Sequence, residues 1–254
     1  MNKTNKKTVL VLNADSIPGQ AACRAVEARK YNHIKVFRNG DSNPPDLFSI
    51  DTTSTNEVQI LAKNLDSQGD KIDFLITCPA PESDRIGAVS YQSFEDMSDS
   101  EWKDNIEQNL RAPVLFCQVF GGRMQARGEG KIIQLVSNVA IDPHDPRNFA
   151  DVHKDESAGC PSAAYTCAMA GVMALSRHLA AMYQDSGVLI NNIVYSPLQE
   201  SIPEALAKSY LQRVPVGRNL TSKDLSNAID LLLNPRSNYI TGQNIKVDGG
   251  VSIW

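Results

Sequence analysis

Three polar residues of types suited to acid–base chemistry are Asn109, Ser137 and Tyr165. Ser137 ends an apolar run typical of a buried strand, and Tyr165 lies near the start of a helix predicted over residues 163–183. Residues four apart share one helix face, so the neighbour of Tyr165 on that face is Met169. A phenol has a pKa near ~10, and a nearby cation favours the phenolate. Because Met169 carries no charge, we expect Tyr165 to stay protonated at neutral pH and to be a poor base.

Strands and helices alternate along the chain, and this order predicts how those residues are held. The predicted strands cover residues 8–12, 33–37, 47–50, 72–77, 131–136, 188–194 and 244–247. The predicted helices cover 20–30, 55–68, 101–124, 163–183, 202–211 and 222–233, with Asp99 or Ser100 as N-cap of the third. Such alternation indicates a parallel sheet with right-handed crossovers. We therefore expect a single α/β domain over residues 1–254, a Rossmann-like doubly wound parallel sheet flanked by helices.

The composition excludes several classes of protein. The chain has 254 residues, of which 42% are hydrophobic and 21% charged, as in an ordinary globular domain. A net charge of −4 disfavours nucleic-acid and membrane-surface binding, which usually need a basic face. The five cysteines are scattered and odd in number, which favours reduced thiols in a cytoplasmic protein. No apolar leader or spanning segment is evident, so we expect no membrane insertion.

Five stretches carry a family resemblance: IDFLI, EWKDNIEQNLRAPVLF, GKIIQLVS, AAYTCAMAGVMALSRHLA and the tail NYITGQNIKVDGG. With them, essentially the whole chain resembles the short-chain dehydrogenase/reductase family. The resemblance implies that Asn109, Ser137 and Tyr165 occupy the catalytic positions, with Ser137 polarising the substrate and Tyr165 as the acid/base. It also implies that Met169 replaces the lysine that lowers the tyrosine pKa and binds the nicotinamide ribose. Alternatively, the three polar residues are retained because they satisfy one another, and Met169 is core packing.

The turn after the first strand also departs from the family. The family has TGxxxGxG there, whereas this chain has NADSIPGQA. Ala14, Pro18 and Gln20 occupy the glycine positions, and Gly19 lies out of register. Proline removes an N–H donor, and the glutamine side chain occupies space where a pyrophosphate would approach the backbone. We expect this turn to bind no cofactor.

The other strand ends retain little of the family's cofactor chemistry. The resemblance implies that Arg38 would contact the cofactor's ribose and suit a 2′-phosphate, and that Asp51 would contact the adenine. Each has an ordinary alternative, because arginines at strand ends are commonly solvated and aspartate is a common N-cap. Residues 77–80 (TCPA) replace the family's NNAG, and Tyr195-Ser196 replaces its Pro-Gly.

A polar segment separates Ser137 from Tyr165, and we describe it as an insertion at about 141–160. It contains six possible metal ligands: His144, Asp145, Asp151, His153, Asp155 and Glu156. Their spacing matches no metal-binding template, and the segment is rich in turn-forming residues. We therefore expect no metal, and a solvated loop or a partner-contact surface instead.

The segments through which members of the family assemble are better preserved here than the catalytic and cofactor-binding segments. The helices predicted over 101–124 and 163–183 form the family's four-helix dimer interface, and VDGGVSIW matches its second interface. This contrast predicts a catalytically inactive subunit that binds no cofactor and forms a hetero-oligomer with an active homologous dehydrogenase. The chain resembles the inert subunit of heteromeric enzymes such as 2-(hydroxybenzyl)succinyl-CoA dehydrogenase, whose substrate class would be a hydroxyacyl-CoA.

Two further hypotheses stay open. The chain is alternatively a divergent NAD(P)-dependent alcohol or ketone oxidoreductase, as a homo-oligomer, with Arg38 and Asp51 holding the cofactor. A third possibility is a lyase similar to halohydrin dehalogenases, which lack the glycine-rich loop. Those keep Tyr-x-x-x-Arg and an aromatic residue in the first turn, and Met169 and NADSIPGQ supply neither.

Overall fold

The structure is a computed structural model that describes residues 6–38, 47–80, 94–142, 162–202 and 204–254. Its centre is a seven-stranded sheet in the order β3-β2-β1-β4-β5-β6-β7, in which every neighbouring pair is parallel. The expected doubly wound parallel sheet is therefore confirmed. The strands are β1 (Thr8–Leu12), β2 (Asn32–Arg38), β3 (Leu47–Ile50), β4 (Phe74–Thr77), β5 (Gly130–Ser137), β6 (Val188–Tyr195) and β7 (Asn244–Val247).

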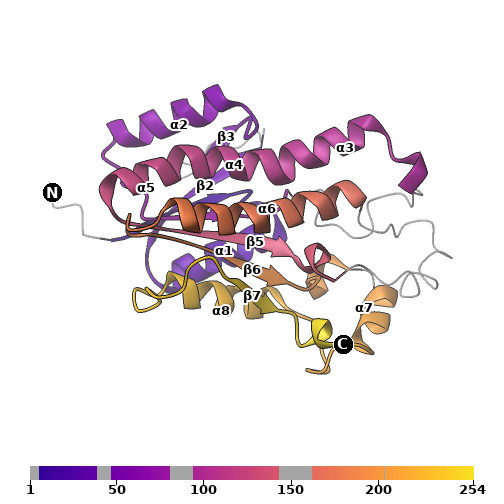
Figure 1. The fold of residues 1–254 in the computed structure, drawn as a ribbon. Coiled ribbons are helices and arrows are strands. Elements are labelled where there is room, and N and C mark those ends of the chain that lie inside the picture. The colour runs from indigo at the N-terminus through magenta and orange to yellow at the C-terminus, as the bar shows by residue number, and fades with distance from the viewer. Residues whose placement is uncertain (1–5, 39–46, 81–93, 143–161, 203) are drawn as a thin grey trace.

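Helices cover both faces of the sheet, as Figure 1 shows. On one face lie α1 (Ile17–Ala28) and α8 (Ser222–Leu233), and their apolar residues share a buried cluster with β1, β4, β5 and β6. On the other face lie α2 (Thr55–Ser67), the helix that runs from α3 to α5, and α6 (Ala163–Met182). The helix α7 (Glu204–Leu211) lies apart from these layers, at the carboxyl ends of the strands.

The helix predicted over 101–124 is continuous but irregular. It consists of α3 (Asp99–Ile106), η2 (Glu107–Arg111), α4 (Ala112–Phe116), η3 (Cys117–Gly121) and α5 (Gly122–Arg127), of which η2 and η3 are π-helical turns. The predicted N-cap was wrong: Ser98 caps the helix, since its side chain accepts a hydrogen bond from the backbone N–H of Glu101. A π turn widens the helix locally and is frequent at functional sites, and Asn109 lies in the first one.

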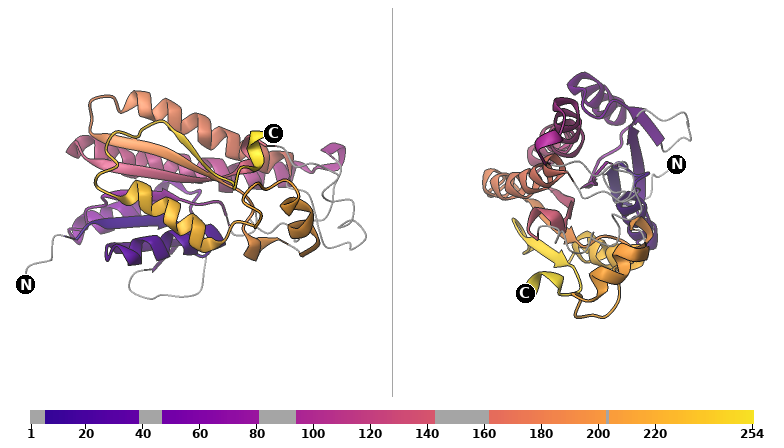
Figure 2. Two further views of the ribbon diagram at one scale, coloured as in Figure 1. Left: turned by 90° about the horizontal axis from the view of Figure 1, so that it is seen from below. Right: turned by 90° about the vertical axis from the view of Figure 1, so that its right-hand side faces the viewer.

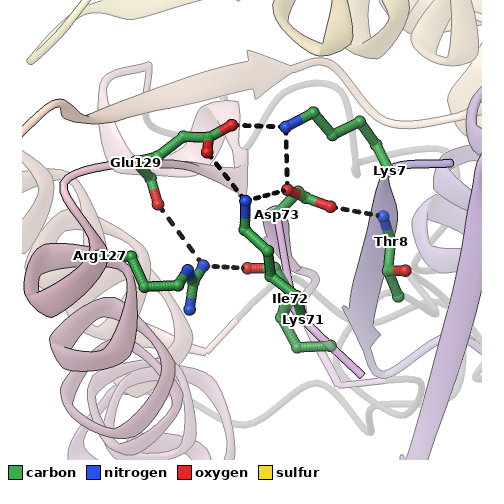
Figure 3. A network of polar contacts seen from close by, with 7 residues as sticks. All are labelled: Lys7, Thr8, Lys71, Ile72, Asp73, Arg127 and Glu129. Atoms are coloured by element: carbon green, nitrogen blue, oxygen red, sulfur yellow. Dashed lines mark hydrogen bonds and ion pairs between the residues drawn. The ribbon is translucent and has the colours of Figure 1, made fainter. Parts of the chain in front are cut away.

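Charged side chains join the starts of three strands at the amino end of the sheet (Figure 3). Asp73, whose side chain is 8% exposed, accepts from Lys7 at 3.0 Å and from the backbone N–H of Thr8 at 2.9 Å. Lys71 lies 3.3 Å from Asp73 and 2.8 Å from Glu129, which also pairs with Lys7. Because these residues precede or begin β1, β4 and β5, the network aligns the central strands at their starts.

This network predicts an acid-sensitive contribution to stability. Hydrogen bonds from Lys7 and Lys71 lower the pKa of Glu129 to about 2. A carboxyl whose pKa is lower in the folded state stabilises the fold above its unfolded value near ~4.3, and that contribution is lost as the pH falls toward 2. Glu129→Gln should therefore lower the free energy of unfolding at neutral pH by under about 1 kcal/mol, because the side chain is half exposed.

The measurement is urea unfolding of both proteins between about pH 7 and pH 2. The difference between wild type and Glu129→Gln should shrink across the acid range and vanish near pH 2. Glu95→Gln is the control, because Glu95 is exposed and forms no ion pair with any described residue. A difference that is independent of pH would contradict the assignment.

Candidate functional site

The candidate site lies at the carboxyl ends of β1, β4, β5 and β6, the edge at which parallel α/β sheets bind ligands. Figure 2 (right) looks onto this edge, where α7 lies near the C-terminal segment. In the β5–β6 pairing Ser137 is opposite Tyr195, so the residues that follow these two strands are neighbours in space. The described residues named from the sequence as catalytic or cofactor-binding all lie at this edge or on a helix packed beside it; they are Arg38, Asp51, Asn109, Ser137 and Tyr165.

The first turn has few free donors for a phosphate group. Ser16 caps α1, and its Oγ accepts from the backbone N–H of Gly19 at 3.0 Å. Pro18 has no N–H, and the N–H of Gln20 bonds to the carbonyl of Ser16 at 2.8 Å. The Gln20 side chain in addition donates to the carbonyl of Asp15 at 3.0 Å. A helix N-terminus binds anions through backbone N–H groups that are free. An anion at this helix start would therefore have to compete with the bonds that Gly19 and Gln20 already make to Ser16.

Gly19 has a structural role that was not predicted from the sequence. A Cβ at this position would lie 2.1 Å from the carbonyl oxygen of Asn13 and 2.8 Å from the Cα of Ala14. Asn13 itself has a positive φ of 56°, so the chain turns sharply where β1 ends. The turn therefore keeps one obligatory glycine, and that glycine permits the close contact of α1 with the end of β1.

The two residues expected to hold a cofactor lie on neighbouring strand ends. Arg38 ends β2 and is exposed. Asp51 follows β3, and its carboxylate accepts from the hydroxyl of Thr53 at 2.6 Å and from its backbone N–H at 2.9 Å. The hydrogen bond from the Thr53 hydroxyl lowers the pKa of Asp51 most, and the bond from the Thr53 N–H lowers it further. The charge of Arg38 acts in the same direction. Asp51 thus organises the turn before α2, while Ser54 is the N-cap.

Asn109 connects the long helix to the turn after β4. Its Oδ1 accepts from the backbone N–H of Ala80 at 3.0 Å, and the residue is 1% exposed. On the other side of that turn, the Asn13 side chain donates to the carbonyl of Cys78 at 2.8 Å. Two asparagines therefore hold residues 78–80 between β1 and the π turn. This geometry gives Asn109 a positioning role, and its predicted catalytic role stays a prediction.

The remaining predicted residues lie around the end of β5. Tyr165 is 4% exposed and belongs to an apolar cluster with Val136, Val139 and Met169. Met169 is 1% exposed and thus packs in the core of this cluster. Ser137 is 8% exposed at the strand end between Val136 and the short helix η4 (Asn138–Ala140). The structure therefore places Ser137 and Tyr165 at the same end of the sheet, with a thioether where the family has its lysine.

A hydroxyl cluster at this edge was not predicted from the sequence. The Tyr210 hydroxyl of α7 accepts from the Asn138 side chain at 2.8 Å and lies 3.5 Å from the Ser196 hydroxyl. All three residues are 5% exposed or less. Burial raises the pKa of Tyr210, so the phenol is neutral at physiological pH. No local sequence signal could have found the cluster, because Tyr210 is 72 residues from Asn138.

The possible metal ligands of the insertion lie outside the described residues. Within the part of the chain that the structure describes, no group of three or more His, Cys, Asp or Glu side chains could hold a metal ion. In the same residues, no helix is both long and apolar enough to cross a membrane.

Comparison with known proteins identifies the family. A family model described as enoyl-(acyl carrier protein) reductase matches residues 28–252. The chain belongs to the short-chain dehydrogenase/reductase family. This family consists of oxidoreductases, and the match confirms the family resemblance described from the sequence.

Relatives of known identity are distant. Subunit BbsD of (2S)-[(R)-hydroxy(phenyl)methyl]succinyl-CoA dehydrogenase from Thauera aromatica is 25% identical over 199 residues, which cover 77% of this chain and 71% of the relative. The 3-oxoacyl-[acyl-carrier-protein] reductase FabG of Staphylococcus aureus is 25% identical over 213 residues, covering 81% and 77%. A short-chain dehydrogenase from Leptospira borgpetersenii, solved with bound NAD+, has a TM-score of 0.82 at 22% identity and covers 98% of this chain and 93% of its own. That structural likeness confirms the fold.

Proposed function

We propose that this chain is a non-catalytic subunit that assembles with an active NAD(P)-dependent dehydrogenase of the same family. The observation that carries the proposal is Met169, which is 1% exposed in an apolar cluster beside Tyr165. A buried thioether supplies no charge to lower a phenol pKa and no donor for a ribose hydroxyl. Proton transfer to or from a substrate alcohol then lacks a tuned acid/base.

The first turn supports the same proposal. A dinucleotide is held chiefly through its pyrophosphate at a helix N-terminus with free N–H groups. Here Pro18 has no donor, and the N–H groups of Gly19 and Gln20 are bonded to Ser16. The cation and the phosphate site are separate requirements of the family chemistry, and this chain departs from both.

The expected partner is a second, active member of the family. The α6 helix exposes Cys167, Ala170 and Ala174, and small side chains allow a close approach of another helix. The Thauera aromatica relative is named as a subunit of a succinyl-CoA dehydrogenase, which supports a role in an enzyme of more than one chain. By that analogy, the substrate of the complex would be a hydroxyacyl-CoA.

The second candidate function is a divergent NAD(P)-dependent alcohol or ketone oxidoreductase, and the comparisons favour it over the first. The relatives described above are named as dehydrogenases or reductases, and the Leptospira borgpetersenii structure contains NAD+. In this case Ser137 and Tyr165 would act on the substrate, and Arg38 and Asp51 would contact the cofactor without help from the first turn.

Cofactor titration of the purified chain distinguishes the two functions. For a non-catalytic subunit we expect no saturable binding of NADH or NADPH at cofactor concentrations up to about 1 mM. A dissociation constant above about 1 mM corresponds to a binding free energy weaker than roughly 4 kcal/mol. Fluorescence of the reduced cofactor is the measurement, with the Leptospira borgpetersenii short-chain dehydrogenase, which was solved with bound NAD+, as the positive control. Micromolar binding, or turnover of a ketone by the chain alone, would establish the oxidoreductase function and exclude the first proposal.

A further inference from the structure

A cavity lies at the amino end of the sheet, opposite to the edge at which parallel α/β sheets bind ligands. It has a volume of about 200 Å³ and is enclosed by the end of α2, the residues that precede β4, and the helical segments η3 and α5. None of the residues described above as catalytic or cofactor-binding lines it. The cavity is therefore a candidate ligand site that is separate from the first.

Part of the lining is apolar. Leu65, Ile72 and Phe120 line the cavity, and each of them is 5% exposed or less. Apolar groups of a ligand gain free energy when they leave water for such surroundings. An engineered apolar cavity of about 150 Å³ holds a benzene ring. The space here is therefore of the right order for one ring, or a branched alkyl group, that carries a further small group.

Arg127 contributes a cation to the same lining (Figure 3). Its Nη2 donates to the carbonyl of Ile72 at 2.6 Å and to the carbonyl of Glu129 at 3.5 Å. These two bonds restrain the guanidinium, while its Nε and Nη1 donate to no described residue. The charge also pairs with no carboxylate in the described part of the chain. A restrained guanidinium with unused N–H groups is suited to a charge-assisted hydrogen bond with a carboxylate.

Arg123 lies one turn before Arg127 and lines the same cavity. Its Nε donates to a carboxylate oxygen of Asp66 at 3.0 Å, and its Nη1 donates to the carbonyl of Val119 at 3.0 Å. Asp66 thus compensates the charge of Arg123 and leaves that of Arg127 uncompensated. Like charges four residues apart on a helix repel each other, so an anion beside Arg127 would relieve a repulsion. The other carboxylate of the lining, Asp70, forms an ion pair with neither arginine.

We propose that this cavity binds a small organic monocarboxylate, whose carboxylate pairs with Arg127 and whose ring or branched alkyl group contacts the apolar lining. Such a ligand is distinct from any substrate or cofactor, because those belong at the other end of the strands. Since it binds the folded chain and not the unfolded one, it stabilises the fold. The site consists of this chain's own residues and does not depend on whether the chain is catalytic.

The test is titration of the full chain with phenylacetate, measured by calorimetry or ligand-detected NMR, with a dissociation constant of about 1 mM expected. Phenylacetamide has the same shape without the charge, and acetate has the charge without the ring. Each should therefore bind to wild type at least about five-fold more weakly than phenylacetate does. Saturating phenylacetate should also raise the midpoint of urea unfolding.

Two substitutions should change the affinity in opposite directions. Arg127→Met keeps an unbranched apolar side chain and removes the charge, so phenylacetate should bind about ten-fold more weakly. Asp66→Asn removes the half-exposed carboxylate that competes for the arginines, so phenylacetate should bind about two-fold more tightly. Arg24→Met is the matched control and should bind as wild type does. Arg24 is exposed in α1 on the opposite face of the sheet and pairs with no described residue.

Equal phenylacetate affinity in wild type and Arg127→Met would overturn the proposal, as would equal affinity of wild type for phenylacetate and phenylacetamide. Asp66→Asn leaves Arg127 in place, so it provides a test that does not depend on how well Arg127→Met folds. Weaker binding of phenylacetate by Asp66→Asn would also contradict the site. Titration with NADH decides the proposed function and leaves these results unchanged.

Discussion

Met169→Lys should give no dehydrogenase turnover and should destabilise the fold by about 3 kcal/mol. Met169 is 1% exposed among Val136, Tyr165 and Val172, so the new ammonium group would enter an apolar cluster. An ion without a partner in such surroundings loses hydration that nothing replaces, and its pKa falls. Under the proposed function activity is not expected, since the first turn keeps Pro18, which has no N–H, and the N–H of Gly19 stays bonded to Ser16.

The loss of unfolding free energy caused by Met169→Lys should depend on pH. A lysine whose pKa is lower in the folded state binds fewer protons there than in the unfolded chain, so stability rises with pH up to the unfolded value near ~10.4. The deficit against wild type should therefore be smaller near pH ~9 than near pH ~7, as measured by urea unfolding. Met169→Leu conserves volume and should cost under about 1.5 kcal/mol at both pH values. Turnover of NADH with a ketone by Met169→Lys would show that the chain does bind a cofactor.

Gly19→Ala should destabilise the protein by about 3 kcal/mol, although alanine forms helices better than glycine does. The added Cβ would lie 2.1 Å from the carbonyl oxygen of Asn13. The opposing atom is backbone, so relief requires that α1 move away from β1 or that the turn at Asn13 open. Either movement disturbs the buried cluster that α1 shares with the sheet. Equilibrium unfolding in urea measures the change.

Gly122→Ala is the matched control for this substitution. Gly122 is exposed in α5, and a Cβ there would have no atom within 4 Å. The replacement should stabilise the protein by up to about 1 kcal/mol, because alanine loses less backbone entropy in a helix. If both variants changed stability by the same amount, the close contact at Gly19 would have no energetic significance.

Most of the fold could be predicted because periodicity is local information. The strands β1 and β4 are short apolar runs, and the helices α2 and α8 repeat their buried residues at helical spacing. The predicted bounds differ mainly at element ends: α1 begins at Ile17, since Ser16 supplies the cap, and β4 begins at Phe74 and not at residue 72. Caps depend on which side chain reaches a free N–H, and several residues near a helix start can do so.

The candidate site was predicted only in part. The absence of a lysine on the face of Tyr165 followed from helical spacing, and the structure adds that Met169 is buried there. The role of Asp51 was left open, and its bonds to Thr53 give it a structural function in the turn. Gly19 was assigned no function, because its importance depends on the distance to a carbonyl on another element.

The sequence by itself determined the class of fold, the family resemblance and the loss of a cation four residues after Tyr165. These depend on neighbours within a few residues, whose relative positions are set by helix and strand geometry. Only the tertiary structure decided that Tyr210 bridges Asn138 and Ser196, residues 72 and 14 positions away. Contacts of that kind arise when packing brings separate elements together at one edge of the sheet, and no local pattern encodes them.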